Sequence, residues 1–159
     1  MKIQMICVGK IKEVYLRELI DHYTKLIRKK YDFEIIEVAD EKTPDGCSLL
    51  MEEQIKEKEA ERILRHIHED GYLYTLEIQG KQPDSLTFAE NLRQLAVQGT
   101  SHIQFVIGGS LGLHQKISNC SNEKLSFSNM TFPHQLMRVI LLEQIYRAYR
   151  INQGEPYHK

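Results

Sequence analysis

HIQFVIGG, residues 102–109, is a largely apolar run that ends in two glycines. A short apolar run closed by glycine is typical of a buried strand that leads into a tight turn. Three similar runs precede it and a shorter one follows it. The sequence therefore predicts strands at IQMICVG (3–9), FEIIEVA (33–39), YLYTLEI (72–78), HIQFVIGG (102–109) and LSFS (125–128).

Segments with helical character separate these strands. Thr87 and Glu90 have capping-box spacing, which predicts a helix start near Phe88, and Pro133 suits the first turn of the last helix. The predicted helices cover residues 12–29, 48–68, 88–98, 113–120 and 134–151. Strands that alternate with helices indicate an α/β fold, with a mostly parallel sheet flanked by helices.

Length and composition favour one domain. The chain has 159 residues, enough for one good core and too few for two ordinary domains, so residues 1–159 are predicted to form a single unit. No apolar run approaches the ~20 residues of a membrane helix, and the polar continuation of MKIQMICVGK is unlike a signal peptide. A cytoplasmic protein is expected. The three cysteines have neither disulfide-frame nor metal-type spacing, which predicts structural or incidental thiols.

The net charge of −1 conceals an uneven distribution. Residues 1–31 carry eight Lys or Arg against three Asp or Glu, whereas residues 32–80 carry five against fourteen. The N-terminal excess, which includes Arg28, Lys29 and Lys30, offers a basic patch for phosphates. A charged helix end that keeps the protein soluble explains the same pattern.

Three strand ends are chemically distinctive: TLEIQG (75–80), VIGGSLG (106–112) and LSFSNMTFP (125–133). Ligands of parallel sheets collect beyond such ends, where loops expose backbone N–H groups. The glycine loop is neither GxGxxG nor a P-loop, and by itself it is equally typical of a tight turn. The last loop lacks a nucleophile paired with a base, but it could line an apolar slot for an adenine-bearing cofactor.

The helix at 134–151 is apolar nearly all round, which predicts burial on all sides and favours a second subunit as the cover. Arg138 stands alone among these apolar neighbours. Because such an arginine needs an anionic partner, it is the best candidate for substrate contact, with a structural ion pair as the alternative.

The segments VGK, TLEIQGK, VIGGSLGL, LSFSNMTFPHQLMRVILLEQIYRA and GEPYHK occur in this order along the chain. Together they resemble, from end to end, the bacterial SPOUT methyltransferases that modify N3 of a pseudouridine in 23S ribosomal RNA. The resemblance implies a C-terminal deep trefoil knot, whereas the pattern alone would predict an unknotted sheet. It also implies a homodimer and S-adenosylmethionine as the cofactor. Leu111 departs from the family pattern, since relatives often have a polar or acidic residue there.

Carried over by position, the resemblance implies cofactor contacts at the three strand ends already singled out. They are Leu76, Gly108, Phe127, Ser128, Asn129, Met130, Thr131 and Phe132.

N3 of a pseudouridine is an imide nitrogen that must lose its proton before it attacks a methyl group, and the reaction requires no metal. We hypothesise that Arg138 faces the negative charge that develops on the uracil, and that Tyr157 or His158 removes or relays the proton. The alternative is that the two tail residues only pack or touch RNA phosphate.

The near-neutral charge favours recognition of assembled ribosomes by shape rather than by electrostatics alone. A non-catalytic ribosome-binding factor is the competing function.

Overall fold

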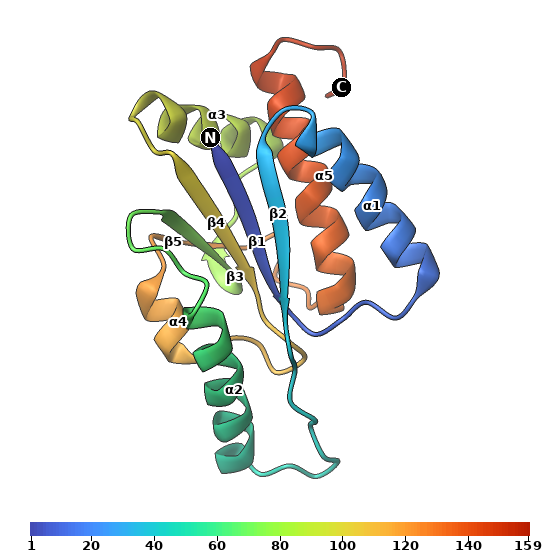
Figure 1. Cartoon of the computed structure of the whole chain (residues 1–159), viewed down its shortest axis with the longest axis vertical. Helices are drawn as coiled ribbons and strands as arrows, with labels where there is room; N and C mark the ends of the chain where they lie inside the picture. The colour runs from blue at the N-terminus through green and yellow to red at the C-terminus, as the bar shows by residue number, and fades with distance from the viewer.

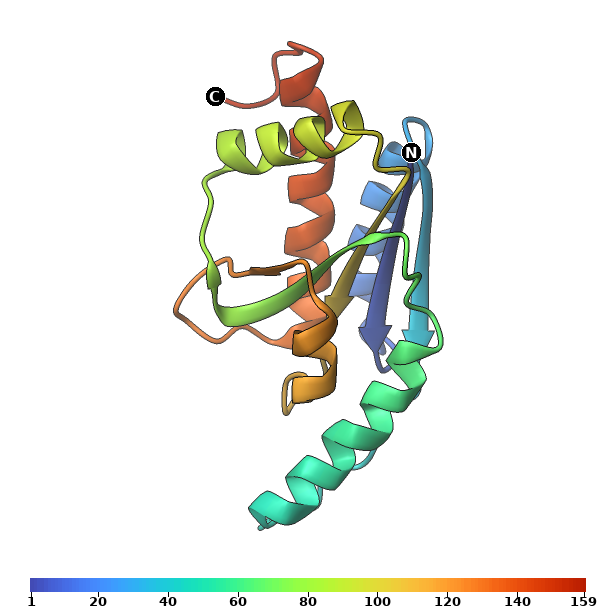
Figure 2. The same cartoon turned by 90° about the vertical axis from the view of Figure 1, so that its left-hand side faces the viewer.

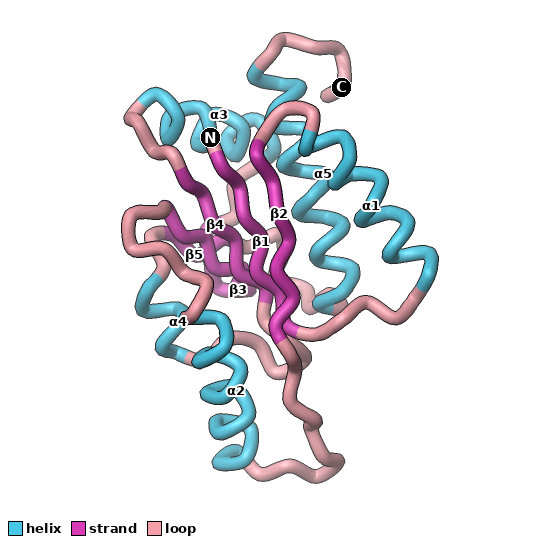
Figure 3. Tube along the Cα trace, in the orientation of Figure 1, coloured by secondary structure: helices cyan, strands magenta, loops and turns pink.

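Five strands alternate with five helices in the computed structural model, which describes all 159 residues (Figures 1 and 3). The strands are β1 (Lys2–Val8), β2 (Asp32–Val38), β3 (Tyr72–Lys81), β4 (His102–Ile107) and β5 (Glu123–Leu125). The helices are α1 (Val14–Arg28), α2 (Leu49–Leu64), α3 (Ser85–Val97), α4 (Gln115–Cys120) and α5 (His134–Asn152).

The strands form one sheet in the order β2-β1-β4-β3-β5, and every pairing is parallel. The predicted α/β class is therefore confirmed. β1 lies between β2 and β4, and its side chains from Ile3 to Val8 are all buried, which explains why they are apolar apart from Gln4, whose side chain is hydrogen-bonded to Glu34 and Gln104. In Figures 1 and 2 the arrowheads of β1 and β2 point toward α2, so the loops that follow these two strands lie at that end of the molecule.

Helices cover both faces of the sheet. The larger core has 19 buried residues and includes side chains of α1, α3 and α5, whereas the smaller one has eight and includes side chains of α2 and α4. α5 packs against both α1 and α3, as Figure 1 shows. The longest helix thus packs on one face of the sheet beside two helices of its own chain.

This packing corrects the argument for a second subunit that rested on the last helix. Leu141, Leu142 and Ile145 are fully buried within the chain, and among the large apolar residues of α5 only Leu136 is classed as exposed, at 37%. α1 and α3 supply the cover that the sequence analysis assigned to a partner. The apolar pattern of α5 therefore does not by itself require a dimer.

Two predicted boundaries were wrong for local reasons. α3 starts at Ser85, because Asp84 Oδ1 accepts a hydrogen bond from the Thr87 N–H at 2.7 Å, while Glu90 binds Arg93 and Gln94 instead of closing a capping box. The fifth strand lies at Glu123–Leu125, so of the predicted LSFS segment only Leu125 belongs to it.

Serine hydroxyls explain that early end of β5. Ser126 Oγ donates to the Ser128 carbonyl at 3.0 Å, and Ser128 Oγ accepts from the Met130 N–H at 3.0 Å. These short-range bonds bend the backbone into turns and so compete with the sheet.

β3 continues through Gly80, where the sequence predicted a break. A Cβ at this position would lie 2.6 Å from the backbone of Lys124, so only glycine lets β5 pass so closely. The helix predicted at 48–68 ends earlier, at Leu64. The segment after it is held by Gln104 of β4, which accepts from the His68 N–H and donates to the His66 carbonyl, both at 2.8 Å.

No helix in the structure combines the length and the apolar character needed to cross a bilayer.

The strand order does not show whether the chain is knotted. The trefoil knot therefore stays a prediction from the resemblance.

Candidate functional site

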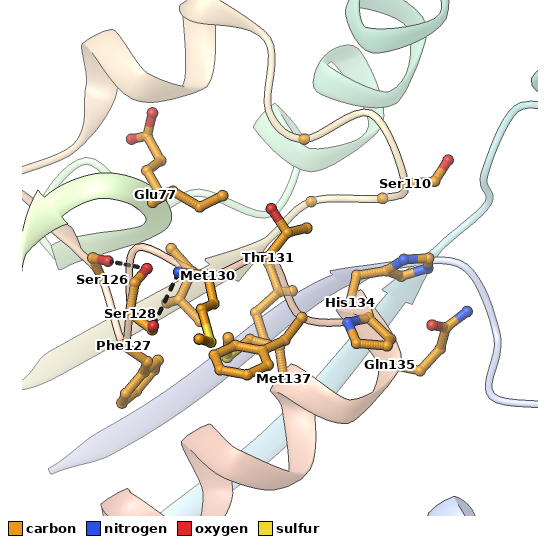
Figure 4. A pocket seen from close by; sticks show the side chains of 18 of the residues that line it. Glu77, Ser110, Ser126, Phe127, Ser128, Met130, Thr131, His134, Gln135 and Met137 are labelled. Carbon is orange, nitrogen blue, oxygen red and sulfur yellow. Dashed lines mark hydrogen bonds between the residues drawn. The ribbon is translucent and has the colours of Figure 1, made fainter.

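Residues 76–78 of β3, the loops that follow β4 and β5, and the first turn of α5 enclose a cavity of about 670 Å³ (Figure 4). These are the three strand ends that the sequence predicted to hold a ligand. Because parallel strands end at the same side of a sheet, segments as distant in sequence as Leu76 and Met137 share its wall.

Most of the predicted cofactor residues line this cavity. Leu76, Gly108, Phe127, Ser128, Met130, Thr131 and Phe132 all belong to its wall. Asn129 does not, because its side chain turns outward and accepts a hydrogen bond from Gln82 Nε2 at 2.8 Å. Leu111, which departs from the family pattern, also lines the cavity, so an apolar side chain stands at that point of the glycine loop.

The last loop presents unused backbone donors. Within residues 127–132 only the Met130 N–H has a hydrogen-bond partner in the chain, the Ser128 hydroxyl. The amides of Phe127, Ser128, Asn129, Thr131 and Phe132 donate to no protein group. An apolar wall with free backbone donors fits an adenine-bearing ligand, whose ring needs both apolar contact and hydrogen bonds.

The glycine loop brings a second stretch of backbone to the wall. Gly109 and Gly112 form an antiparallel bridge, and the Gly112 N–H donates to the Gly109 carbonyl at 3.0 Å. A Cβ on Gly108 would lie 2.8 Å from the Gly112 carbonyl carbon. The turn is therefore closed so tightly that no side chain fits at Gly108.

Sequence reasoning missed the two titratable residues of the wall, Glu77 and His134. Both oxygens of Glu77 are held, one by the Thr75 hydroxyl at 2.7 Å and the other by the Ser118 hydroxyl at 2.7 Å. Both residues fall within stretches that were singled out, TLEIQG and the LSFSNMTFPHQLMRV segment. The sequence thus indicated the right segments, but nothing in the spacing of the residues distinguished these two side chains from their neighbours.

Arg138 occupies a buried position beside the cavity, beneath the carboxyl ends of β1 and β2. Its side chain is only 2% exposed and forms an ion pair with Glu37 at 2.7 Å. The guanidinium also donates to the carbonyls of Val8 and Gly9 at 2.9 and 2.8 Å. The structure thus provides the ion pair that was the alternative to substrate contact, and in this arrangement Arg138 does not line the cavity.

Arg138→Ala is expected to lower the free energy of unfolding by about 2–4 kcal/mol, because two backbone carbonyls and the Glu37 carboxylate lose their donor. Glu37 is 38% exposed, so water screens part of that loss. Urea unfolding followed by circular dichroism measures the change. A loss below about 0.5 kcal/mol, the range of ordinary surface substitutions, would show that these bonds do not hold β1 to α5.

The C-terminal tail packs against α5 of its own chain, away from the cavity. The Tyr157 ring stands edge-on to Tyr146, with centroids 5.3 Å apart, and its hydroxyl donates to Glu143 at 3.3 Å. Arg147 lies over the same ring at 4.9 Å and contacts His158 Nδ1 at 3.2 Å. Burial, followed by the charge of Glu143, raises the pKa of Tyr157 above its usual value.

This arrangement separates the two predicted parts of the active site. The wall of the cavity ends on α5 at Met137, whereas the tail's contacts begin six residues later at Glu143, about 9 Å along the helix. Figures 1 and 2 place the C-terminus near the end at which β1 begins, opposite the loops of the cavity. The structure of one chain does not bring Tyr157 and His158 to its own cavity.

Comparisons with known proteins show the family of the chain and agree with its fold. The family model described as "Predicted SPOUT methyltransferase" matches residues 1–158. The chain is 57% identical to "Putative ribosomal RNA large subunit methyltransferase H" of Methanococcus maripaludis and 57% identical to "Ribosomal RNA large subunit methyltransferase H" of Bifidobacterium adolescentis, over 100% of both chains in each case. It is also 55% identical to "Ribosomal RNA large subunit methyltransferase H" of Clostridium novyi, again over 100% of both chains.

A solved structure, that of a probable methylase family protein from Haemophilus influenzae, is similar in fold. Its TM-score is 0.51 at 9% identity, and the match covers 99% of this chain and 70% of that one.

Proposed function

Since the chain belongs to the SPOUT methyltransferase family, we propose that it transfers the methyl group of S-adenosylmethionine to N3 of a pseudouridine in 23S ribosomal RNA. The observation that carries this proposal is the cavity with unused backbone amides at residues 127–132. The names of the full-length relatives support ribosomal RNA of the large subunit as the substrate.

We propose that the cofactor occupies the cavity with its adenine against Leu76, Phe127 and Phe132. The free amides of the last loop supply hydrogen bonds to the ring edge, and Gly108 allows the backbone of the glycine loop to approach the ligand. When bound, S-adenosylmethionine supplies a methyl group already activated on a sulfonium. The chain then has to position the nitrogen and exclude water.

Gly108→Val is expected to weaken S-adenosylmethionine binding at least ~10-fold, because the new Cβ would lie 2.8 Å from the Gly112 carbonyl carbon and force the turn open. The remaining structure should persist, since the change is confined to one loop. Calorimetric titration measures the affinity, and circular dichroism checks the fold. An unchanged affinity would place the cofactor elsewhere.

We further propose that the enzyme is a homodimer in which each tail completes the cavity of the other subunit. Large apolar side chains are exposed on α1 at the end where α5 begins: Val14 (58%), Tyr15 (66%) and Leu19 (43%), joined on α5 by Leu136 (37%). We call these four residues the apolar patch. A second copy that covers the patch with its α5 reversed would carry its own tail toward the cavity.

In this dimer Tyr157 or His158 of one subunit helps to remove or relay the N3 proton in the pocket of the other. Arg138 is proposed to support the developing negative charge from beneath the pocket. Its guanidinium is held in position by the ion pair with Glu37 and by the hydrogen bonds to the carbonyls of Val8 and Gly9.

The substrate is proposed to be ribosomal RNA within assembled, cytoplasmic ribosomes. A chain with net charge −1 gains little from phosphate attraction, so the shape of the particle has to contribute to recognition. The basic segment at residues 1–31 remains a candidate for phosphate contact.

The test uses purified protein, S-adenosylmethionine and ribosomes from a strain that lacks this chain. Mass mapping should show one added methyl on a modified uridine of 23S RNA, and little or none when the RNA is free of protein. If the protein binds ribosomes but neither binds S-adenosylmethionine by calorimetry nor adds a methyl, it is the non-catalytic ribosome-binding factor.

A further inference from the structure

His134 is the first residue of α5 and lies in the wall of the cavity (Figure 4). Neither nitrogen of its ring makes a hydrogen bond or an ion pair within the chain, in contrast to Glu77, whose two carboxylate oxygens are both held by hydroxyls. Among the lining side chains, His134 is therefore the one that combines a titratable nitrogen with free hydrogen-bonding capacity.

The surroundings of His134 favour its neutral form. Burial lowers the pKa of the imidazole below its usual value, the charge of Arg138 one turn along α5 lowers it further, and Asp40, which follows β2, partly opposes both. Its place at the N-terminus of α5 acts in the same direction, because the helix dipole disfavours a cation there. At neutral pH the ring is thus a base with a free lone pair.

We propose that His134 is the proton acceptor for N3 of the target base, which rests on the methyl transfer proposed above. The N3 proton passes to the free nitrogen of the imidazole, and the electron pair left on N3 forms the bond to the methyl carbon. The electrons of the broken carbon–sulfur bond stay on sulfur, which becomes a neutral thioether. The imidazolium later releases its proton to water, directly or through the tail.

This assignment divides the work between His134 and the tail. His134 belongs to the wall of the same pocket that holds the cofactor, so it is in place in every subunit. Tyr157 is poorly suited to take the first proton, because its hydroxyl already donates to Glu143 and the raised pKa keeps it protonated. The tail of the partner then closes the pocket and relays the proton outward.

The first experiment compares the pH dependence of single-turnover methylation on ribosomes for the wild type, His134→Gln and the control His68→Gln. His68 is exposed after α2, and its ring lies tilted against that of His102, with 4.6 Å between the ring centroids. The wild-type rate should rise with pH and level off at a pKa below the usual histidine value of about 6.5. His134→Gln should be about 100-fold slower or worse, and its rate should keep rising with pH, while His68→Gln follows the wild type.

A second measurement needs no variant. Nuclear magnetic resonance of the histidine-labelled wild type gives the pKa of the His134 ring directly, and this value has to agree with the acid limb of the rate profile. The assignment is overturned if the two pKa values disagree, or if the His134→Gln enzyme has the wild-type rate and the wild-type pH dependence. If the wild type itself adds no methyl, the proposed function fails instead, so the two failures are distinguishable.

Discussion

Tyr15→Asp combined with Leu136→Asp is expected to convert the proposed homodimer into monomers and to remove methylation. Both side chains are exposed in the single chain, at 66% and 37%, so aspartate is tolerated there before association. In the dimer each carboxylate would be buried without a partner, which costs several kcal/mol per site. Because about 1.4 kcal/mol corresponds to a tenfold change, the dissociation constant should rise by at least ~100-fold.

Light scattering and sedimentation measure the mass of the variant at several concentrations. Val97→Asp is the matched control, because Val97 is 69% exposed on α3 and lies outside the apolar patch. Leu141 would be a poor choice, since its side chain is fully buried in the chain's own core and a charge there would unfold the monomer. A double variant that stays dimeric and keeps full activity would remove the patch from the interface.

Much of the fold follows from local sequence because the sheet is buried on both faces. A strand such as β1, covered on each side, is largely apolar, and that pattern is visible without any structure. The errors fall where a distant residue decides a local outcome. The end of α2 depends on Gln104 of β4, and the passage of β3 through Gly80 depends on the backbone of Lys124.

The candidate site likewise has parts that the sequence could predict and parts that it could not. The three segments could be predicted, because the carboxyl-terminal parts of parallel strands and their loops meet at one edge of the sheet; β3 contributes residues 76–78 of the strand itself. The partner of Arg138 could not, because Glu37 lies 101 residues away in sequence and only the packing of α5 beneath β1 and β2 joins them. His134 was missed for a related reason. It stands out because its ring nitrogens have no hydrogen-bond partner in the folded chain, and a sequence pattern does not show this.

Deleting Tyr157, His158 and Lys159 is expected to slow methylation by about 100-fold or more, because closure and proton relay are lost together. Binding of S-adenosylmethionine should persist, since none of the three residues lines the cavity. Stability should fall by only about 1 kcal/mol, the value of the contact between Tyr157 and Tyr146. Single-turnover rates, calorimetry and urea unfolding measure the three quantities. A truncated enzyme with normal turnover would leave the tail as a packing element.

Mixed dimers decide which subunit's pocket the tail serves. One subunit carries Gly108→Val with an intact tail, and the other has an intact cavity but lacks residues 157–159; two different affinity tags isolate the heterodimer. If each tail serves the opposite pocket, one pocket collects both defects and the other has an intact cavity and an intact tail, so activity returns although neither homodimer is active. If the tail serves its own subunit, both pockets stay damaged and the heterodimer is inactive. Because the contacts on Glu143, Tyr146 and Arg147 hold the tail away from its own cavity, activity is expected to return. Purified heterodimers that bind S-adenosylmethionine at one site and still fail to methylate ribosomes would place the tail in its own subunit's site.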